Sequence, residues 1–116
     1  MGTIETHRAG LFAETLAALA LRLCGWRILA RRFRTPVGEI DIIARRRGVI
    51  AFVEVKRRPE LADALAAVTP ANAARVRRAA AWWLNAHAVL ADNCACRFDV
   101  MAIAPYALIR HIPNAF

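Results

Sequence analysis

The segment from Gly38 to Lys56 constrains the fold more than any other, because two apolar, β-prone runs in it flank a short turn rich in arginine. This pattern predicts a β-hairpin. The charged residues of the hairpin do not fit an ordinary sheet, since they interrupt both runs. They are Glu39 and Asp41 in the first run, and Glu54 and Lys56 in the second. Residues two apart on a strand point to the same face, about 6–7 Å from each other, so each run presents its charged pair on one face.

The register of the hairpin decides whether the two pairs meet. We expect Arg45–Gly48 to form a four-residue loop. Glu39 then lies opposite Glu54, and Asp41 is the diagonal neighbour of Glu54, at about 7–8 Å or less. A loop one residue shorter would turn one of the two sets to the other face of the sheet. In the expected register the carboxylates raise each other's pKa unless a cation lies between them, and a divalent metal ion is the simplest such cation.

Lys56 is the only lysine of the chain, since 16 of the 17 basic residues are arginine. The ammonium group is compact and its pKa responds to its surroundings, whereas a guanidinium stays charged. A lysine with a chemical role is one interpretation. The other is an ordinary charged residue at a strand end that keeps the sheet from aggregating.

The balance of charge indicates a polyanionic partner, because the net charge is +8 and the pI about 11.2. Nucleic acid is the first such partner and an anionic membrane surface the second. The arginines that we expect to contact nucleic acid are Arg45, Arg46, Arg47, Arg57, Arg58, Arg75 and Arg78. Arg75 and Arg78 share a predicted helix face with Trp82, which suits contacts to phosphate and base. A solvated basic face with one half-buried tryptophan is an equally open interpretation.

Composition also bounds the size and the compartment. With 59% hydrophobic and 22% charged residues, the chain can bury a core, and we expect one domain over residues 1–116 with residues 1–8 loosely ordered. Three cysteines without framework spacing are typical of a reducing cytosol. The apolar run Leu16–Leu23 is too short to span a bilayer, so we expect a cytoplasmic protein that does not enter a membrane.

The first predicted helix runs from about Ala9 to Cys24, with Gly25 as its C-terminal stop. Apolar residues at helical spacing predict its core-facing side, namely Phe12, Leu16, Leu19 and Leu23. Glu14 lies on a different side, among small or apolar residues. An acid in that place is either a rim residue in water or a buried acid with a function, and the residues alone leave both open.

Turn signals and alternation predict the remaining elements. We expect strands over Trp26–Arg34, Cys96–Ala104 and Ala107–Ile112, a short helical turn within residues 60–68, and a helix from its N-cap Thr69 to about Leu90. Val76, Ala80, Trp83 and Leu90 would face the core. The order α-β-β-β-α-β-β is typical of an α/β fold with one mixed central sheet flanked by helices. The long second helix then requires the fourth strand to run parallel to a neighbour.

Glu14, Asp41 and the Glu54–Lys56 run offer oxygen ligands, with no histidine cluster. Such ligands favour Mg²⁺ or Mn²⁺ over zinc. An ion of this kind polarises a phosphate and generates hydroxide from water, while Lys56 could orient that water or balance the charge that develops at phosphorus. The arginines would hold the nucleic-acid backbone. The residues therefore suggest metal-dependent hydrolysis of phosphodiester bonds.

These residues also carry a resemblance to known proteins. Asp41 with the Glu54–Lys56 run resembles the PD-(D/E)xK nuclease signature, and Gly10 with Glu14 resembles its first-helix acid. A wider pattern covers nearly the whole chain, in the segments Gly10–Glu14, Gly38–Ala44, Phe52–Arg58, Ala67–Thr69, Cys96–Val100 and His111–Phe116. This pattern resembles the YraN-type family of small bacterial proteins, which is similar in fold to archaeal Holliday-junction resolvases.

The resemblance implies a restriction-endonuclease-like, resolvase-like fold and a Mg²⁺-dependent endonuclease that acts on DNA, with branched DNA as one substrate. The metal ligands that it implies are Glu14, Asp41, Glu54 and the backbone carbonyl of Val55, and Lys56 would be the catalytic lysine. Resolvases act as dimers, so a homodimer is a further expectation. Two other functions stay open, namely a nucleic-acid-binding protein of this fold without useful turnover and a basic protein-interaction module.

The chain departs from the family pattern in one place. Many members of the family carry a lysine or arginine soon after the Thr-Pro of the second long helix, whereas residues 71–74 here are Ala, Asn, Ala and Ala. Arg75 is the first base, and Asn72 could replace only a neutral hydrogen bond, so a phosphate contact there would be weaker or shifted. Glu39 belongs to the family pattern but not to the minimal nuclease signature. We interpret it as a support for the metal ligands or as a salt-bridge partner of an arginine.

Overall fold

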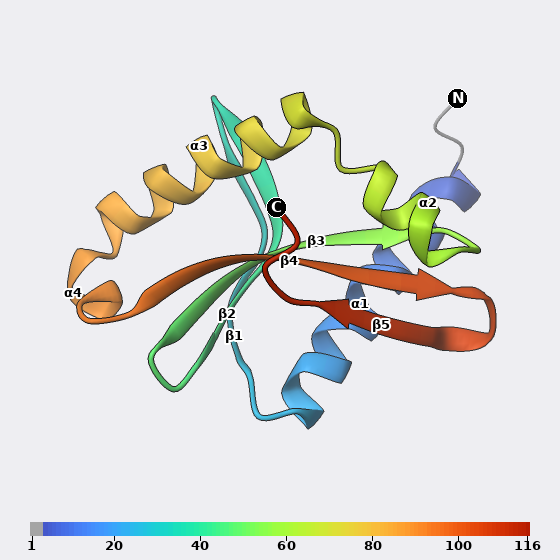
Figure 1. Cartoon of the computed structure of the whole chain (residues 1–116), viewed down its shortest axis with the longest axis horizontal. Coiled ribbons are helices and arrows are strands. Elements are labelled where there is room, and N and C mark those ends of the chain that lie inside the picture. Colours follow the sequence, from blue (N-terminus) through green and yellow to red (C-terminus); the bar gives the residue numbers. More distant parts are fainter. Residues whose placement is uncertain (1–3) are drawn as a thin grey trace.

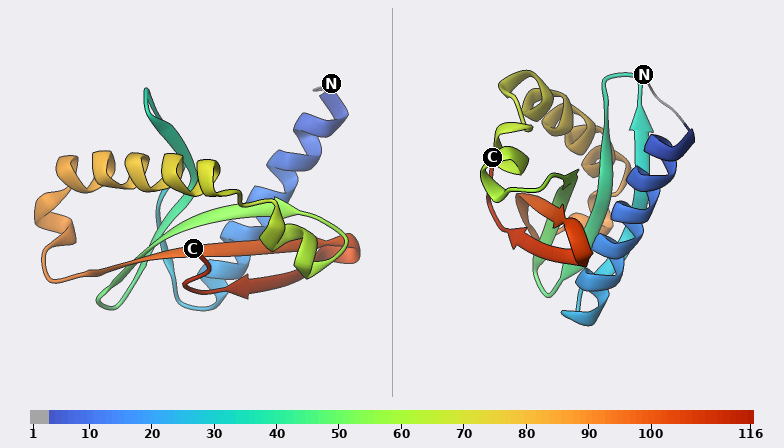
Figure 2. Two further views of the ribbon diagram at one scale, coloured as in Figure 1. Left: turned by 45° about the horizontal axis from the view of Figure 1, so that its top comes forward. Right: turned by 90° about the vertical axis from the view of Figure 1, so that its right-hand side faces the viewer.

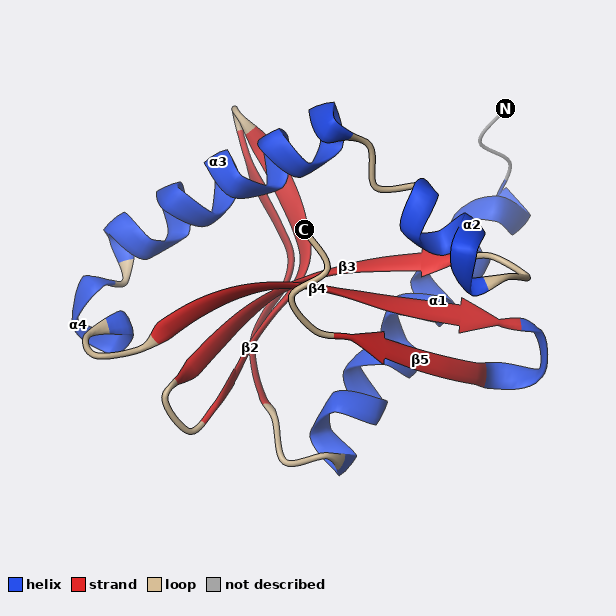
Figure 3. Cartoon of the chain, viewed as in Figure 1, coloured by secondary structure: helices blue, strands red, loops and turns tan. Residues whose placement is uncertain are grey.

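The structure, a computed structural model, describes residues 4–116. Its elements are α1 (Ile4–Leu23), β1 (Arg27–Thr35), β2 (Gly38–Arg46), β3 (Val49–Arg57), α2 (Leu61–Ala66), α3 (Pro70–Ala86), α4 (Ala88–Ala91), β4 (Ala95–Ala104), the 3₁₀ turn η1 (Pro105–Ala107) and β5 (Leu108–Ile112). Figures 1 and 3 show them. The predicted order of the long elements is confirmed, α2 is the expected helical turn, and α4 and η1 are additions. Of the segment 1–8, residues 1–3 lie outside the described residues and the rest belong to α1.

The five strands form one mixed sheet in the order β1-β2-β3-β4-β5. Neighbouring strands are antiparallel except β3 and β4, which are parallel. This confirms the expected parallel pairing of the fourth strand, which α3 makes possible because a parallel pair needs a long crossover connection. β5 lies at one edge of the sheet and β1 at the other.

The two faces of the sheet carry separate cores, with α1 over one face and α3 over the other (Figures 1 and 2). The first core includes Ala17, Leu21, Ile42 and Val53, and the second includes Ile43, Phe52, Val76 and Trp83. Successive residues of β2 thus serve opposite faces, which is the two-residue period of a strand. The middle of the sheet is covered on both sides, so an acid placed there is removed from water.

α1 packs on the sheet with a different side from the predicted one. Of the four predicted residues, Leu16 is partly buried against the core, whereas Phe12, Leu19 and Leu23 are 64%, 50% and 80% exposed, so the prediction is wrong for these three. The side that packs carries Ala13, Ala17, Ala18 and Leu21, together with Glu14. Small side chains let the helix axis come close to the strands, and this outweighs the larger apolar area of the other side. Within residues 4–116, no helix combines the length and the apolar character that crossing a membrane requires.

α3 begins as predicted and ends early. The Thr69 side chain caps it by accepting a hydrogen bond from the Asn72 N–H at 3.1 Å. The helix ends at Ala86, because the backbone of His87 leaves the helical region with φ of −127° and ψ of 37°. Of the predicted core residues, Val76, Ala80 and Trp83 are buried, whereas Leu90 lies in α4 and is exposed, so that assignment is wrong.

The turn between β2 and β3 is tighter than expected. Arg46 pairs with Val49, so the turn is Arg47–Gly48 and the four-residue loop Arg45–Gly48 is wrong. Arg47 takes a left-handed backbone with φ of 56°, a conformation that glycine or asparagine usually signals in a sequence. The observed register differs from the expected one by an even number of residues, so every side chain lies on its expected face of the sheet.

At Gly38 the backbone of α3 comes very close to β2. A Cβ atom on Gly38 would collide with the backbone carbonyl of Arg75. We expect Gly38→Ala to lower the free energy of unfolding by about 1–3 kcal/mol, because the helix backbone must move away. Gly10→Ala is the matched control, since a Cβ there meets nothing within 4 Å and alanine favours a helix by about 0.5–1 kcal/mol. Urea unfolding compares the two variants, and equal stabilities would contradict the close approach.

Candidate functional site

Asp41 and Glu54 lie where two strands of the sheet separate. The last pair of the β2–β3 ladder is Ile42 with Val53. Beyond it β2 turns toward α3, while β3 runs on toward α2 (Figure 1). The Val55 N–H donates a hydrogen bond to Asp41 Oδ2 at 2.8 Å instead of to a strand. The sheet thus opens into a fork, with an acid at the first position of each arm.

Two cavities meet at this fork. The first has a volume of about 400 Å³ and is lined by α1, β1, β2 and the end of β3. The second has a volume of about 240 Å³ and lies between the fork and the start of α3. The residues that line both are Glu39, Asp41, Val55 and Lys56. We call the two cavities together the acidic cleft.

Glu54 and Lys56 lie close together in this cleft. Glu54 is buried, and its Oε2 lies 3.4 Å from Lys56 Nζ. The lysine side chain is only 20% exposed. Lys56 is therefore not a solvated residue at a strand end, because its ammonium is turned into a partly buried acidic site.

Burial and repulsion change the titration of the two acids. Burial raises the pKa of Glu54 to about 8, and the charge of Asp41 adds to this increase, while Lys56 opposes it. Burial likewise raises the pKa of Asp41, against the lowering effect of the Val55 N–H. The two carboxyl groups titrate as a coupled pair, and the pKa of each lies above its usual value. Without a cation, the pair holds a proton at neutral pH.

This shared proton makes the stability of the metal-free protein depend on pH. Because the pKa of Glu54 in the folded state, about 8, lies above the usual 4.5, the contribution of this group is complete below the usual value and is lost as the pH rises through the folded value. We expect the free energy of unfolding, measured with a chelator, to fall between about pH 5 and about pH 9. Glu54→Gln, which stays neutral, should flatten the profile. Urea unfolding at stepped pH measures this, and a wild-type profile as flat as that of the variant would contradict it.

Glu14 reaches the first cavity from α1 and is 6% exposed, so it is a buried acid rather than a rim residue. Its Oε1 accepts a hydrogen bond from Arg31 Nε at 3.1 Å, and its Oε2 lies 3.8 Å from Arg32 Nε. Burial raises the pKa of Glu14, which the charge of Arg31 opposes. The fork thus brings Asp41 and Glu54 together, while Glu14 is held by arginines. Among the described residues no group of three or more His, Cys, Asp or Glu side chains is placed to hold a metal ion.

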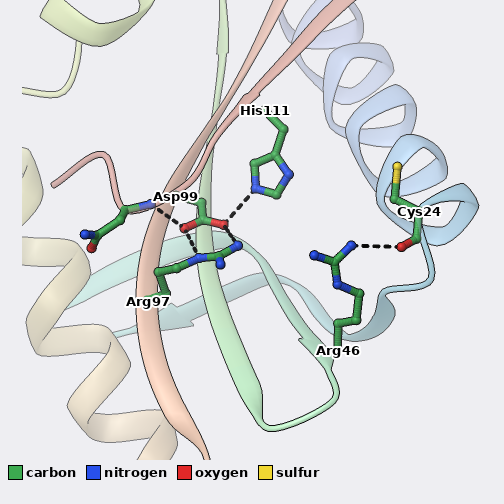
Figure 4. Close-up of polar contacts among 6 residues, drawn as sticks. Cys24, Arg46, Arg97, Asp99 and His111 are labelled. Carbon is green, nitrogen blue, oxygen red and sulfur yellow. Dashed lines mark hydrogen bonds and ion pairs between the residues drawn. The ribbon is translucent and has the colours of Figure 1, made fainter.

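The predicted nucleic-acid arginines fall into separate places. Arg57 and Arg58 line the first cavity, and Arg75 lines the second. Arg78 follows on α3, outside the lining of the cleft. Arg45, Arg46 and Arg47 lie at the other end of the hairpin, where Arg46 donates to the Cys24 carbonyl at 3.0 Å (Figure 4). The cleft therefore carries only part of the predicted basic surface.

The sequence reasoning missed the arginines of β1. Arg31 and Arg32 approach Glu14, and Arg32 and Arg34 line the first cavity. Arg34 also pairs with Glu39, its partner in the strand register, at 3.5 Å. The run of arginines directly before the acidic hairpin was the signal that could have found them, because the preceding strand is the natural antiparallel neighbour.

Two residues at the edge of the cleft have modest roles. The Glu39 and Arg34 side chains are both exposed, so their ion pair contributes about 0–1 kcal/mol, and the salt-bridge interpretation of Glu39 fits this geometry. Asn72 lines the second cavity, and its Oδ1 is buried without a hydrogen-bond partner among the described residues. Asn72 thus presents a neutral oxygen to the cleft.

A second buried carboxylate, Asp99 on β4, is surrounded by hydrogen-bond donors rather than by another carboxyl group (Figure 4). It accepts two hydrogen bonds from the Arg97 guanidinium at 2.9 Å and one from the Asn114 N–H at 2.9 Å, and it lies 2.7 Å from His111 Nε2. Burial alone would raise the pKa of Asp99, but the bonds from His111 and Arg97 hold it below its usual value. Asp99 is satisfied within the chain and ties β4 to β5 and to the C-terminal segment. We interpret its role as structural, in contrast to Asp41 and Glu54 at the fork, whose carboxyl groups repel each other.

Comparison with known proteins finds one matching family and close relatives. The model of the Uncharacterised protein family UPF0102 matches residues 13–103. A UPF0102 protein of Rhodopseudomonas palustris is 54% identical over 97% of this chain and 86% of its own length. UPF0102 proteins of Bradyrhizobium diazoefficiens and Nitrobacter winogradskyi are each 53% identical over 97% of this chain, and over 84% and 95% of their own lengths. The matched region contains the whole fork and Glu14.

Proposed function

We infer that this chain, which belongs to the uncharacterised protein family UPF0102, is a metal-dependent nuclease that hydrolyses phosphodiester bonds of DNA. The observation that carries the proposal is the carboxyl pair of half-buried Asp41 and buried Glu54, whose repulsion the neighbouring lysine only partly relieves. The pair lies in a cleft with arginines on its walls. A divalent cation would neutralise the pair, and a phosphodiester would neutralise the arginines.

The residues of the fork suit Mg²⁺ or Mn²⁺. Mg²⁺ is commonly held by one or two carboxylates together with water and substrate phosphates. Asp41 and Glu54 would supply the carboxylates, and the Val55 carbonyl, on the strand edge that faces Asp41, would supply a third oxygen. Such an ion, when bound, acts as a Lewis acid toward phosphate and lowers the pKa of a water molecule. Glu14 could join as a further carboxylate only by leaving Arg31, and its role as a ligand stays a prediction.

Lys56 is placed to stabilise developing charge. Its ammonium lines both cavities of the cleft and is largely shielded from water. Electrostatic interactions are stronger where water is excluded. We therefore assign to Lys56 the stabilisation of negative charge on the phosphate oxygens while water attacks phosphorus.

The basic walls of the cleft would position the substrate. Arg57, Arg58 and Arg75 can neutralise phosphates of one strand, which gives affinity without base specificity. Acids on two adjacent strands beside a long helix suit a PD-(D/E)xK, resolvase-like nuclease. We extend the proposal to that fold, to branched DNA as a substrate and to a homodimer.

Single-turnover cleavage assays on duplex, single-stranded and four-way-junction DNA test the proposal. We expect the wild type to cleave at least one of them in Mg²⁺ or Mn²⁺ and none in EDTA. Lys56→Ala should cleave about 100- to 1,000-fold more slowly, because it removes a charge that acts on the transition state. Arg110→Ala is the matched control, since it removes one positive charge at an exposed place on the edge strand β5.

The two other functions lead to different outcomes. A DNA-binding protein without turnover would leave all three DNAs intact in either metal, yet bind them with an affinity that falls steeply with salt. A basic protein-interaction module would not bind DNA even at low salt. Either result would contradict the nuclease.

A further inference from the structure

A third cavity, which we call the apolar cavity, adjoins the acidic cleft beside α1. Its volume is about 300 Å³, near the lower end of the range for ligand pockets, about 300–1,000 Å³. Its walls come from α1, the end of β3 and the connection between β4 and β5. The apolar side chains that line it include Phe12, Leu16, Pro59, Ile103, Pro105 and Tyr106. A cavity of this size and lining suits a single flat ring system.

The apolar cavity and the acidic cleft share a wall. Ala13, Arg57 and Arg58 line both. Guanidinium groups contact the phosphates of nucleic acid. A strand that enters the acidic cleft would therefore meet two guanidinium groups at the boundary with the apolar cavity. Along this path the carboxylates come first, the guanidiniums second, and the apolar and aromatic side chains last. In a bound strand these groups would contact the scissile phosphate, the next phosphate and a base, respectively.

Two aromatic rings beside this cavity are turned to water. Tyr106 is 98% exposed, and Phe12 is largely exposed. Tyr106 also has a left-handed backbone with φ of 64°, which is uncommon for a bulky residue and costs energy. The turn η1 therefore holds an aromatic ring in the solvent at an energetic cost, next to a cavity with a basic wall.

We propose that the apolar cavity binds one unpaired base of the nucleic-acid strand that occupies the acidic cleft, stacked against Tyr106 and Phe12. The proposal rests on the proposed nuclease function and names its substrate class, which is DNA with unpaired nucleotides next to the cleaved bond. A paired base cannot enter without leaving its stack. Every base has a π face, so the cavity would distinguish unpaired bases from paired ones but would not distinguish one type of base from another.

Binding in EDTA tests this without cleavage, using fluorescence anisotropy on a blunt duplex and on the same duplex with a single-stranded overhang. We expect the wild type to bind the overhang DNA about tenfold more tightly, as stacking of one base on an aromatic ring provides. Tyr106→Asn should lose this difference and keep the affinity for the blunt duplex, because asparagine tolerates the left-handed backbone. Tyr106→Phe keeps the ring and should keep the difference. A 2-aminopurine in the overhang, which loses fluorescence when it stacks, reports the contact directly.

Three results would overturn the base site. One is a wild type that binds both DNAs equally, and another is a Tyr106→Asn variant with the wild-type preference. The third is a wild-type dimer that becomes monomeric in Tyr106→Asn with unchanged DNA binding, which would assign the exposed ring to an interface between two copies. Cleavage in Mg²⁺ is measured separately, so each result leaves the nuclease function to its own test.

Discussion

Asp41→Asn is expected to lower the single-turnover cleavage rate by about three orders of magnitude or more, because a divalent ion supplies several kcal/mol of charge stabilisation and about 1.4 kcal/mol corresponds to a factor of ten. Asparagine lacks the charge that holds the ion. Its carbonyl oxygen can still accept the hydrogen bond that the Val55 N–H donates to Asp41. The change therefore removes the charge that binding of the metal ion requires and keeps the hydrogen bond that holds the fork.

The same variant should be at least as stable as the wild type when metal is absent. Burial raises the pKa of Asp41, and its charge adds to the increase in the pKa of Glu54. A neutral side chain at this position ends the repulsion. Activity and stability then change in opposite directions, which is the behaviour of a residue kept for function at a cost to folding.

Cleavage in Mg²⁺ and urea unfolding in EDTA measure the two effects of Asp41→Asn. Asp92→Asn is the matched control, because it makes the same chemical change at an exposed residue that lines neither cavity of the cleft, and it should leave both quantities close to the wild type. An unchanged cleavage rate in Asp41→Asn would exclude Asp41 from the site. A loss of stability of about 2 kcal/mol or more would instead identify Asp41 as a structural acid, as expected when the loss of a hydrogen-bonding group leaves its partner unsatisfied.

Asp99→Ala is expected to lower the free energy of unfolding by about 3–5 kcal/mol, since it removes a fully buried carboxylate and leaves its partly buried donors without an acceptor. Those donors are the Arg97 guanidinium, the Asn114 N–H and the His111 ring. Glu39→Ala provides the comparison, because an exposed ion pair contributes about 0–1 kcal/mol. Urea unfolding at neutral pH distinguishes the two costs.

The stability that Asp99 contributes should also disappear in acid. Because the folded-state pKa of Asp99 lies below the usual 3.8, its contribution is complete above that usual value and is lost as the pH falls through the folded-state value. Wild type and Asp99→Ala should thus differ fully at neutral pH and converge in strong acid. A constant difference across this range would mean that Asp99 contributes by packing rather than by charge.

The hairpin and its acids could be predicted from the sequence because they follow local rules. Strand periodicity placed Asp41 and Glu54 on strands that pair, and the face of each residue survived a wrong loop length because the error in register was an even number of residues. The loop itself could not be predicted. Arg47 takes a conformation that its residue type does not signal.

The packing of α1 could not be predicted by the same rules. Helical periodicity selects the face with the largest apolar side chains, here the one with Phe12 and Leu19, but the sheet accepts the face with alanines. That choice depends on how closely a helix can approach strands, which is a property of the assembled fold. It also buried Glu14 and placed it beside Arg31, a pairing between residues 17 positions apart.

The fork has one consequence for the exchange of amide hydrogens with solvent. In β3 the amide of Val53 belongs to a residue inside the ladder, whereas the amide of Val55 is bonded to the carboxylate of Asp41. The rate at which the Val55 amide exchanges its hydrogen for deuterium thus depends on the charge and position of the Asp41 side chain. A single backbone amide in this sheet should therefore report, in the exchange rate alone, whether the carboxylate beside it is bare, protonated or engaged by a cation.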